Sequence, residues 1–473
     1  MKKQLFFDDF YLFAKDNIIR KYGKPELIST YIDPICSTDF CTGNVFKLDN
    51  GKYRMLYFAH SKEFSGKKLF SAISDDGINF QPEKICNPET DTDKMYSHEI
   101  MSLKNGEEVA YIFQDTHCED AKERYKLLMT EFCYEKLWVE NVLYVSEDLL
   151  NWKLKPNSCW GEGGEPLTGV FYNKHKQVYT VVQRPFWGVR SVGYKETKDW
   201  ENYSEYNYCL NTDPLDEGLS EIYGMFPFEF DGMYIGIQHM YRHLKSELSA
   251  KYKGGIIDTQ LSYSYDGRYW QRSVREPFIT GVTDINKNYA RHNMVWVPCM
   301  IKGNDENIYF YGSATEEEHG TAFDNLGKGK IFIYKLRKDG FVSLASDNID
   351  NLASVATREK VWNSGDIHLN IKAEKATVAV YVTDESETVM GNNLGIARPI
   401  EGFTHEDCIE FSGESFDWTP KFKNGKTLDD LRGKTLVFEI NFKNGELFSL
   451  WGDYIDLFNT QAARYRKFKA LPE

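Results

Sequence analysis

The sequence lacks several patterns that mark common classes of protein. No apolar run approaches the roughly 20 residues that span a membrane, so we expect no membrane partner. No P-loop, Gly-x-Gly-x-x-Gly, His-Glu-x-x-His or Gly-x-Ser-x-Gly pattern occurs, which leaves a nucleotide enzyme or a serine hydrolase without support. The 9 cysteines include no Cys-x-x-Cys pair. They are expected to be the reduced thiols of a cytoplasmic protein.

Positive charge is also in short supply. The 57 Lys and Arg residues face 71 Asp and Glu residues, which gives a formal net charge of −14. Nucleic acid is therefore disfavoured as a partner, because binding to phosphates needs clustered Lys and Arg. Asp8 and Asp9 stand where the apolar part of an export signal would run, so we expect no such signal. A neutral ligand or a small solute is favoured.

Aromatic residues are abundant, at 15%, and a polar turn recurs along the chain. In this turn Asp or Ser bonds the backbone two residues on, Gly takes a positive φ, and an aromatic residue holds the turn against the sheet. The copies are Ser264–Trp270, Ser74–Phe80 and Ser146–Trp152, with shorter versions at Lys195–Trp200 and Lys338–Phe341. Self-similarity at a spacing of roughly 50 to 70 residues is typical of solenoids and propellers.

Alternating apolar residues between these turns predict an all-β fold built from antiparallel meanders. Such meanders, closed into a ring, predict a five-bladed β-propeller over residues 1–351, with a short helix around Phe10–Arg20. Residues 352–473 lack the repeated turn but keep short alternating strands, which predicts a C-terminal β-sandwich. The expected first strands of the meanders are Phe40–Phe46, His98–Leu103, Glu165–Tyr172, Glu221–Phe230 and Asn293–Ile301.

The first strand of each blade lines the central channel of a propeller, so residues at the starts of these strands converge. Converging carboxylates raise one another's pKa, so that one carboxyl stays protonated beside an ionised one. Cleavage of a glycosidic bond needs such a pair. The converging candidates are Asp33 or Asp39, His98 with Glu99, Glu165, Glu221, and Arg291 with His292.

A family resemblance is carried by the repeated turns and by Tyr31–Pro34, Gly43–Phe46, Lys52–Tyr57, Glu123–Lys126 and Ile222–Met225. These stretches resemble the five-bladed-propeller glycosidases, the superfamily of fructosidases, levansucrases and arabinanases (glycoside hydrolase families 32, 43 and 68). Gly425–Lys434 and Asn444–Phe448 resemble the sandwich domain appended to fructosidase-like members. The resemblance covers nearly the whole chain and is architectural.

In that superfamily an aspartate of the first blade, an aspartate of the second and a glutamate of the third carry the chemistry. The resemblance implies Asp39 as nucleophile or base, with Asp33 as its competitor, and Glu165 as general acid. From the residues alone, Asp33 before Pro34 also suits an ordinary turn, and Glu165 also suits a solvated loop.

The second-blade aspartate has no clear counterpart. His98 and Glu99 stand at the expected strand start, whereas Asp115 comes later and also suits a hairpin cap. Glu221, on the fourth blade, is an extra carboxylate that could replace it. The Arg-Asp-Pro and Trp-Met-Asn-Asp-Pro-Asn-Gly patterns of fructosidases are absent.

The remaining candidates are expected to bind substrate. Trp187 suits a stacking platform for a sugar face or a core position. Arg291 and His292 suit a sugar hydroxyl, a substrate carboxylate or a metal, although no spacing demands a metal or another cofactor.

The sequence thus predicts a glycoside hydrolase acting on a short oligosaccharide, with fructoside-like or furanoside-like substrates favoured. One alternative is a phosphorylase, in which Arg291, His292, Arg242 and His243 bind phosphate. Another is a non-catalytic carbohydrate-binding propeller. The oligomeric state stays open, with the sandwich as a candidate dimer surface for a homo-oligomer.

Overall fold

The computed structural model confirms an all-β chain. It describes residues 2–35, 37–38, 43–61, 64–103, 107–133, 138–156, 158, 169–185, 190–216, 220–243, 255–272, 275–279, 294–315, 330–384 and 396–457. The helices within these ranges are short 3₁₀ turns, Ala121–Glu123 and Leu428–Leu431. No helix in the same ranges has the length and apolar character that a membrane crossing needs. The chain divides into two compact units, unit 1 with residues 1–23 and 338–473 and unit 2 with residues 24–337.

Unit 1 includes the N-terminal strands, which differs from the expected division at residue 351. The pairs are β1 (Lys2–Leu5) with β30 (Thr435–Asp456), β2 (Leu12–Asp16) with β26 (Leu352–Thr357), and β3 (Ile18–Tyr22) with β25 (Val342–Ser346). The prediction of a short helix around Phe10–Arg20 is wrong. Asn17 takes a left-handed φ of 52° between β2 and β3, and strand pairing overrides the local helix propensity.

The core of unit 1 lies on two long strands. β27 (Lys360–Asp384) pairs with β30 and also with β28 (Ile396–Pro399) and β29 (Phe411–Trp418). Trp362 of β27 is fully buried and packs against Phe438 and Tyr454 of β30. Because Phe6 and Leu12 are buried in the same cluster, the N-terminal segment completes this core.

Unit 2 consists of antiparallel meanders in sequence order. The first holds β5 (Ser37–Thr38), β6 (Asn44–Lys47), β7 (Tyr53–Ser61), β8 (Phe64–Ser74), β9 (Gln81–Pro82) and β10 (Glu99–Ser102). The second holds β11 (Glu107–Gln114), β12 (Tyr125–Cys133), β13 (Trp138–Ser146) and β14 (Lys153–Leu154). The third holds β15 (Gly169–Asn173), β16 (Val178–Gln183), β17 (Val192–Thr197) and β18 (Asn207–Leu210).

The last sheet of unit 2 contains two further groups, joined by a single parallel pair, Ile257 with Met294. The first group is β19 (Ser220–Phe230), β20 (Met233–His243) and β21 (Gly255–Ser264). The second is β22 (Met294–Lys302), β23 (Ile308–Thr315), β24 (Lys330–Leu336) and β4 (Glu26–Tyr31). The outermost strand of this last group therefore comes from the start of the unit.

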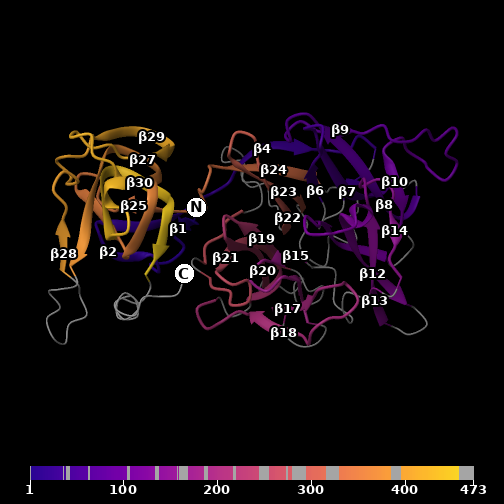
Figure 1. The fold of residues 1–473 in the computed structure, drawn as a ribbon. Coiled ribbons are helices and arrows are strands. Elements are labelled where there is room, and N and C mark those ends of the chain that lie inside the picture. Colours follow the sequence, from indigo (N-terminus) through magenta and orange to yellow (C-terminus); the bar gives the residue numbers. More distant parts are fainter. Residues whose placement is uncertain are drawn as a thin grey trace. The chain divides into compact units, whose positions relative to one another are not determined.

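The first strands of the meanders form a closed ring. β6 lies beside β11, β11 beside β15, β15 beside β19, β19 beside β22, and β22 beside β6. Figure 1 shows β6, β15, β19 and β22 toward the middle of unit 2 and β10, β13, β18 and β4 at its rim. The inner strands approach closely, because a Cβ on Gly169 of β15 would lie 2.3 Å from Pro227 of β19.

The prediction that His98–Leu103 forms the first strand of the second meander is wrong. Residues 99–102 form β10, which pairs with β8 at the outer side of the first meander. The inner strand of the second meander is β11. Both stretches are apolar and bounded by turns, so periodicity alone does not distinguish an inner strand from an outer one.

The repeated turn has the predicted hydrogen bonds. Ser74 Oγ accepts from the amide of Gly77 at 3.0 Å, and Asp76 Oδ1 accepts from the amides of Ile78 and Asn79, each at 2.8 Å. Gly77 has a φ of 76°. The same bonds recur around Asp148, Asp199 and Asp266.

Non-glycine residues hold the strained position in two copies of this turn. Leu149 has a φ of 70° and Trp200 a φ of 65°. Trp200 therefore stands at the position of Gly77 and not at the position of Phe80, where Lys195–Trp200 was expected to place it. Tyr203 stands at the position of Phe80 and packs against the hydrophobic cluster in which Trp200 is buried.

Candidate active site

The structure describes only some of the predicted site residues. Asp39, Glu165, Trp187, Arg291 and His292 lie outside the described residues. Glu221, Asp33, His98, Glu99 and Asp115 are described, and they lie in four different surroundings.

Glu221 lies at the start of β19, at the N-terminal end of the inner strands. Its carboxylate accepts from Arg190 Nη1 at 2.7 Å and contacts His243 Nε2 at 2.8 Å. Arg190 precedes β17, and His243 is the last residue of β20, so three separate stretches supply this group. Burial alone raises the pKa of Glu221, but the hydrogen bonds from His243 and Arg190 outweigh it and lower the pKa. The carboxylate is therefore ionised at neutral pH.

Further cations and aromatic faces surround Glu221. The guanidinium groups of Arg184 and Arg190 lie 4.7 Å and 5.3 Å from the ring centroid of Tyr223. Arg190 also lies 5.1 Å from the ring of Tyr241. The Arg184 side chain is buried, and this burial lowers its pKa. Two arginines, a histidine and a carboxylate have the hydrogen-bond donors and acceptors that suit hydroxyls or an anion.

Sequence reasoning did not single out Arg184 or Arg190 as binding residues. Arg184 directly follows the apolar strand β16, and polar residues at the end of a buried strand are a signal for a site. His243 is a phosphate-binding candidate under the phosphorylase alternative. Its neighbour Arg242 instead bonds Asp258 of β21 at 2.8 Å.

Asp33 and His98 contact each other in an enclosed network. His98 Nε2 lies 3.0 Å from Asp33 Oδ2, Tyr57 donates a short hydrogen bond to the same oxygen, and the hydroxyls of Tyr57 and Tyr31 are 2.9 Å apart. The amide of Ile35 donates to Asp33 Oδ1 at 2.8 Å. The Asp33 side chain has 0% exposure. This network connects β4, β7 and the segment before β10.

Glu99 and Asp115 each form a buried ion pair elsewhere. Glu99 Oε1 accepts from Lys68 Nζ at 2.6 Å on the outer strands of the first meander. Asp115 follows β11 and accepts from Lys126 Nζ at 2.7 Å and from the Tyr179 hydroxyl at 3.0 Å. Because Asp115 follows the C-terminal end of an inner strand, it lies at the end of the ring opposite to Glu221.

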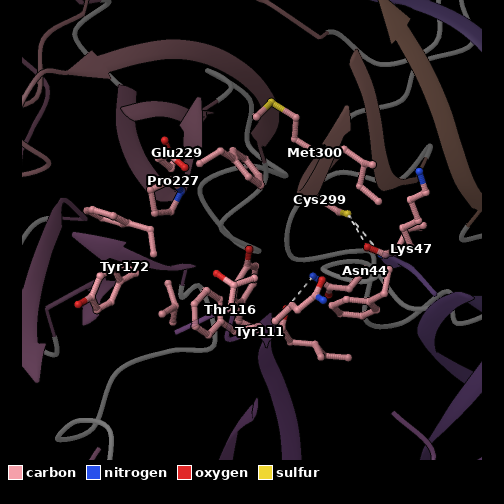
Figure 2. Close-up of a pocket in the computed structure, with 18 of the residues that line it drawn as sticks. Asn44, Lys47, Tyr111, Thr116, Tyr172, Pro227, Glu229, Cys299 and Met300 are labelled. Carbon is pink, nitrogen blue, oxygen red and sulfur yellow. Dashed lines mark hydrogen bonds between the residues drawn. The ribbon is translucent and has the colours of Figure 1, made fainter. Parts of the chain in front are cut away.

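A pocket of about 320 Å³ occupies that opposite end. All the inner strands line it near their C-terminal ends, through Lys47, Gln114, Tyr172, Glu229 and Ile301 among others. The inner strands therefore run in the same direction around the ring. Figure 2 shows Tyr172, Pro227 and Glu229 on one side of the pocket and Asn44, Lys47 and Cys299 on the other, with Tyr111 and Thr116 between them.

Within the described ranges, no group of three or more His, Cys, Asp or Glu side chains is arranged to hold a metal ion.

No family model and no curated protein sequence matches the chain. Similar solved structures include one titled glycoside hydrolase, 14% identical, covering 67% of this chain and 92% of that chain with a TM-score of 0.42. An N-acetylgalactosamine deacetylase from F. plautii is 12% identical, with 69% and 97% covered and a TM-score of 0.43. A β-1,2-mannobiose phosphorylase from Listeria innocua is 13% identical, with 66% and 96% covered and a TM-score of 0.43. Likeness at these TM-scores does not establish an activity.

Proposed function

We propose that unit 2 is a five-bladed β-propeller, that unit 1 is a β-sandwich, and that the protein is a glycosidase acting at the N-terminal end of the ring. The closed ring of inner strands supports the propeller, and so does the pairing of β4 with β24. The observation that carries the function is the ionised carboxylate of Glu221, held between Arg190 and His243 beside the face of Tyr223. Ionised carboxylates stabilise an oxocarbenium-like transition state, and aromatic faces suit sugar rings.

The proposed acid and base, like Glu221, stand near the starts of inner strands. Asp39 precedes the inner strand β6, Glu165 precedes β15, and Arg291 with His292 precede β22. Glu221 is the second residue of the inner strand β19, so it also lies at the start of an inner strand. We assign Asp39 as nucleophile or base and Glu165 as general acid. Glu221, kept ionised by its partners, binds substrate hydroxyls or modulates the pKa of the other acids.

The proposed substrate is a short oligosaccharide with a fructoside-like or other furanoside-like unit, and Trp187 is the proposed stacking residue. A cytoplasmic location, which the sequence predicts, suits short imported substrates.

A second candidate, a phosphate-dependent phosphorylase, is favoured by the cations around Glu221. The side chains of Arg184, Arg190 and His243 surround the carboxylate of Glu221. Arginine forks bind phosphate oxygens bidentately. Phosphate would then take the place of water as the acceptor of the glycosyl group.

The test is turnover of nitrophenyl glycosides and short oligosaccharides by wild type and by Glu165→Gln, Asp39→Asn and Glu221→Gln, with and without phosphate. We expect loss of turnover by several orders of magnitude in the first two variants, with folding intact. Turnover only with phosphate assigns the phosphorylase. Binding of a sugar without turnover on any substrate would replace both proposals with a carbohydrate-binding propeller.

A further inference from the structure

The pocket at the C-terminal end of the ring has no part in the proposed reaction. Its deep residues Tyr111 and Pro227 are buried, whereas Lys47, Lys174 and Glu229 are exposed at its rim. A cavity of about 320 Å³ falls within the range of roughly 300–1,000 Å³ that is usual for small-molecule sites.

Packed aromatic side chains separate this pocket from Glu221. Tyr111 stacks on Phe226 at 5.7 Å, and Tyr223 contacts Trp296 at 5.3 Å. All four belong to one buried cluster. A molecule in the pocket therefore does not reach the candidate active site, so the pocket is a separate site.

Apolar and aromatic side chains make up much of the pocket wall. Phe113, Phe228, Met300 and Ile301 line it, and the ring of His117 stacks on Tyr172 with centroids 3.8 Å apart. Such surfaces favour an aromatic or similarly flat apolar body, because they offer stacking area and few hydrogen bonds.

Tyr111 presents a polar group within this apolar surrounding. The residue is 7% exposed, and burial raises the pKa of its hydroxyl. Among the described residues this hydroxyl has no hydrogen-bond partner, and its oxygen is open to the pocket. It lines the pocket, so a bound molecule is placed to supply the missing partner.

The rim carries positive charge in a chain whose net charge is −14. Lys174 Nζ pairs with Glu229 Oε2 at 3.0 Å, which cancels one charge. Lys47 Nζ bonds Asn304 Oδ1 at 2.5 Å, which is a neutral partner. These contacts leave the positive charge of Lys47 at the mouth of the pocket uncompensated. This charge is therefore available to an anionic group.

We propose that this pocket is a binding site for a small, flat, largely apolar organic molecule that carries one anionic group. The apolar body lies against the walls beside Tyr111, and the anionic group lies near Lys47. This site is independent of the proposed function, because it requires no catalytic residue.

The test uses 8-anilinonaphthalene-1-sulfonate as the probe, titrated by fluorescence against the full-length protein. We expect saturable binding to one site. Lys47→Gln is expected to weaken it roughly threefold to tenfold, and Glu229→Gln, which frees Lys174, to strengthen it by a similar factor. Lys153→Gln, on the outer strand β14, removes the same charge elsewhere and is expected to leave the affinity unchanged. N-phenyl-1-naphthylamine, which lacks the sulfonate, is expected to respond to neither rim variant.

A third variant locates the site. Thr116 is exposed at the rim, so Thr116→Trp is expected to fill the mouth and abolish probe binding while thermal unfolding stays unchanged. The Glu221→Gln variant is expected to bind the probe as wild type does, whatever its turnover. The proposal is overturned if binding is not saturable, if Thr116→Trp binds normally, or if Lys47→Gln and Glu229→Gln shift the affinity in the same direction.

Discussion

At the scale of single residues, the charge state of Glu221 depends on two neighbours. Arg190 and His243 lower its pKa against the opposing effect of burial. Removing the guanidinium in Arg190→Gln is expected to raise the pKa, so the ionised form appears only at higher pH. The acidic limb of the profile of kcat/KM against pH should therefore move upward.

A matched control exists in the same unit. Arg268 donates to Glu196 through Nε at 3.0 Å, in an ion pair between the third and fourth meanders. Arg268→Gln should leave the acidic limb where it is. An unchanged limb in Arg190→Gln would mean that Glu221 does not titrate in the reaction.

Replacing either of two buried tyrosines with phenylalanine is expected to change the free energy of unfolding by different amounts. The Tyr57 hydroxyl bonds both Tyr31 and the enclosed Asp33, whereas the Tyr111 hydroxyl has no partner among the described residues. Tyr57→Phe removes a donor from a buried carboxylate and should lower the free energy of unfolding by roughly 1–3 kcal/mol. Tyr111→Phe should change it by less than about 0.5 kcal/mol. Urea unfolding of the two variants measures the difference, and equal losses would contradict it.

The sequence could identify candidate acids but not their surroundings. Asp33, His98 and Glu99 have the residue types of a site, and only the packing of β4, β7, β8 and β10 shows that Asp33 and Glu99 are enclosed by their partners. Arg184 and Arg190 were not singled out, because their approach to Tyr223 depends on how the third and fourth meanders meet in the ring.

At the scale of elements, the repeated turn depends on one carboxylate per copy. Burial alone raises the pKa of Asp76, but the amides of Asn79 and Ile78 and the side chains of Ser74 and Asn79 lower it strongly. Asp76→Asn loses the charge in these bonds and should lower the free energy of unfolding by roughly 1–2 kcal/mol at pH 7. The exposed Asp75, 84% exposed and paired only at the surface with Lys52, gives the control Asp75→Asn, which should cost little.

The pH dependence of this difference follows from the lowered pKa. The stabilisation by Asp76 is present above its unfolded-state pKa of about 3.9 and is lost as the pH falls below that value. The gap between wild type and Asp76→Asn should therefore shrink between about pH 5 and pH 2. A gap that stays constant over this range would show that the charge has no role.

Local elements were predicted better than their pairing. The turns at Ser74, Ser146 and Ser264 were predictable because each forms its own hydrogen bonds within a few residues. The stretches 10–20 and 98–103 were assigned wrongly, since pairing partners far along the chain decide whether a short apolar stretch is a helix, an inner strand or an outer strand.

At the scale of the whole molecule, each unit is completed by residues from the start of the chain. β4 adds the outermost strand to the last group of unit 2, beside β24. β1, β2 and β3 pair with strands of unit 1 that follow residue 337. The two units meet in the sequence between residues 23 and 24 and between residues 337 and 338. With these boundaries, each of these strands lies in the same unit as its pairing partner.

This division predicts different behaviour for two fragments. Residues 24–337 contain all strands of the ring and its closing strand, so this fragment should unfold in one cooperative transition. Residues 338–473 lack β1, β2 and β3 and the buried Phe6 and Leu12. Losing those two side chains alone removes roughly 3–6 kcal/mol of burial energy, and the freed edges of β25, β26 and β30 invite aggregation.

Joining residues 1–23 to residues 338–473 through a flexible linker should restore a folded unit, because the missing strands return to their edges. The measurement is the cooperativity of thermal unfolding by circular dichroism, together with solubility, for all three fragments. A folded 338–473 fragment would contradict the prediction, since it would show that the N-terminal strands are dispensable. An unfolded 24–337 fragment would instead show that the ring depends on unit 1, although its own strand pairs are complete.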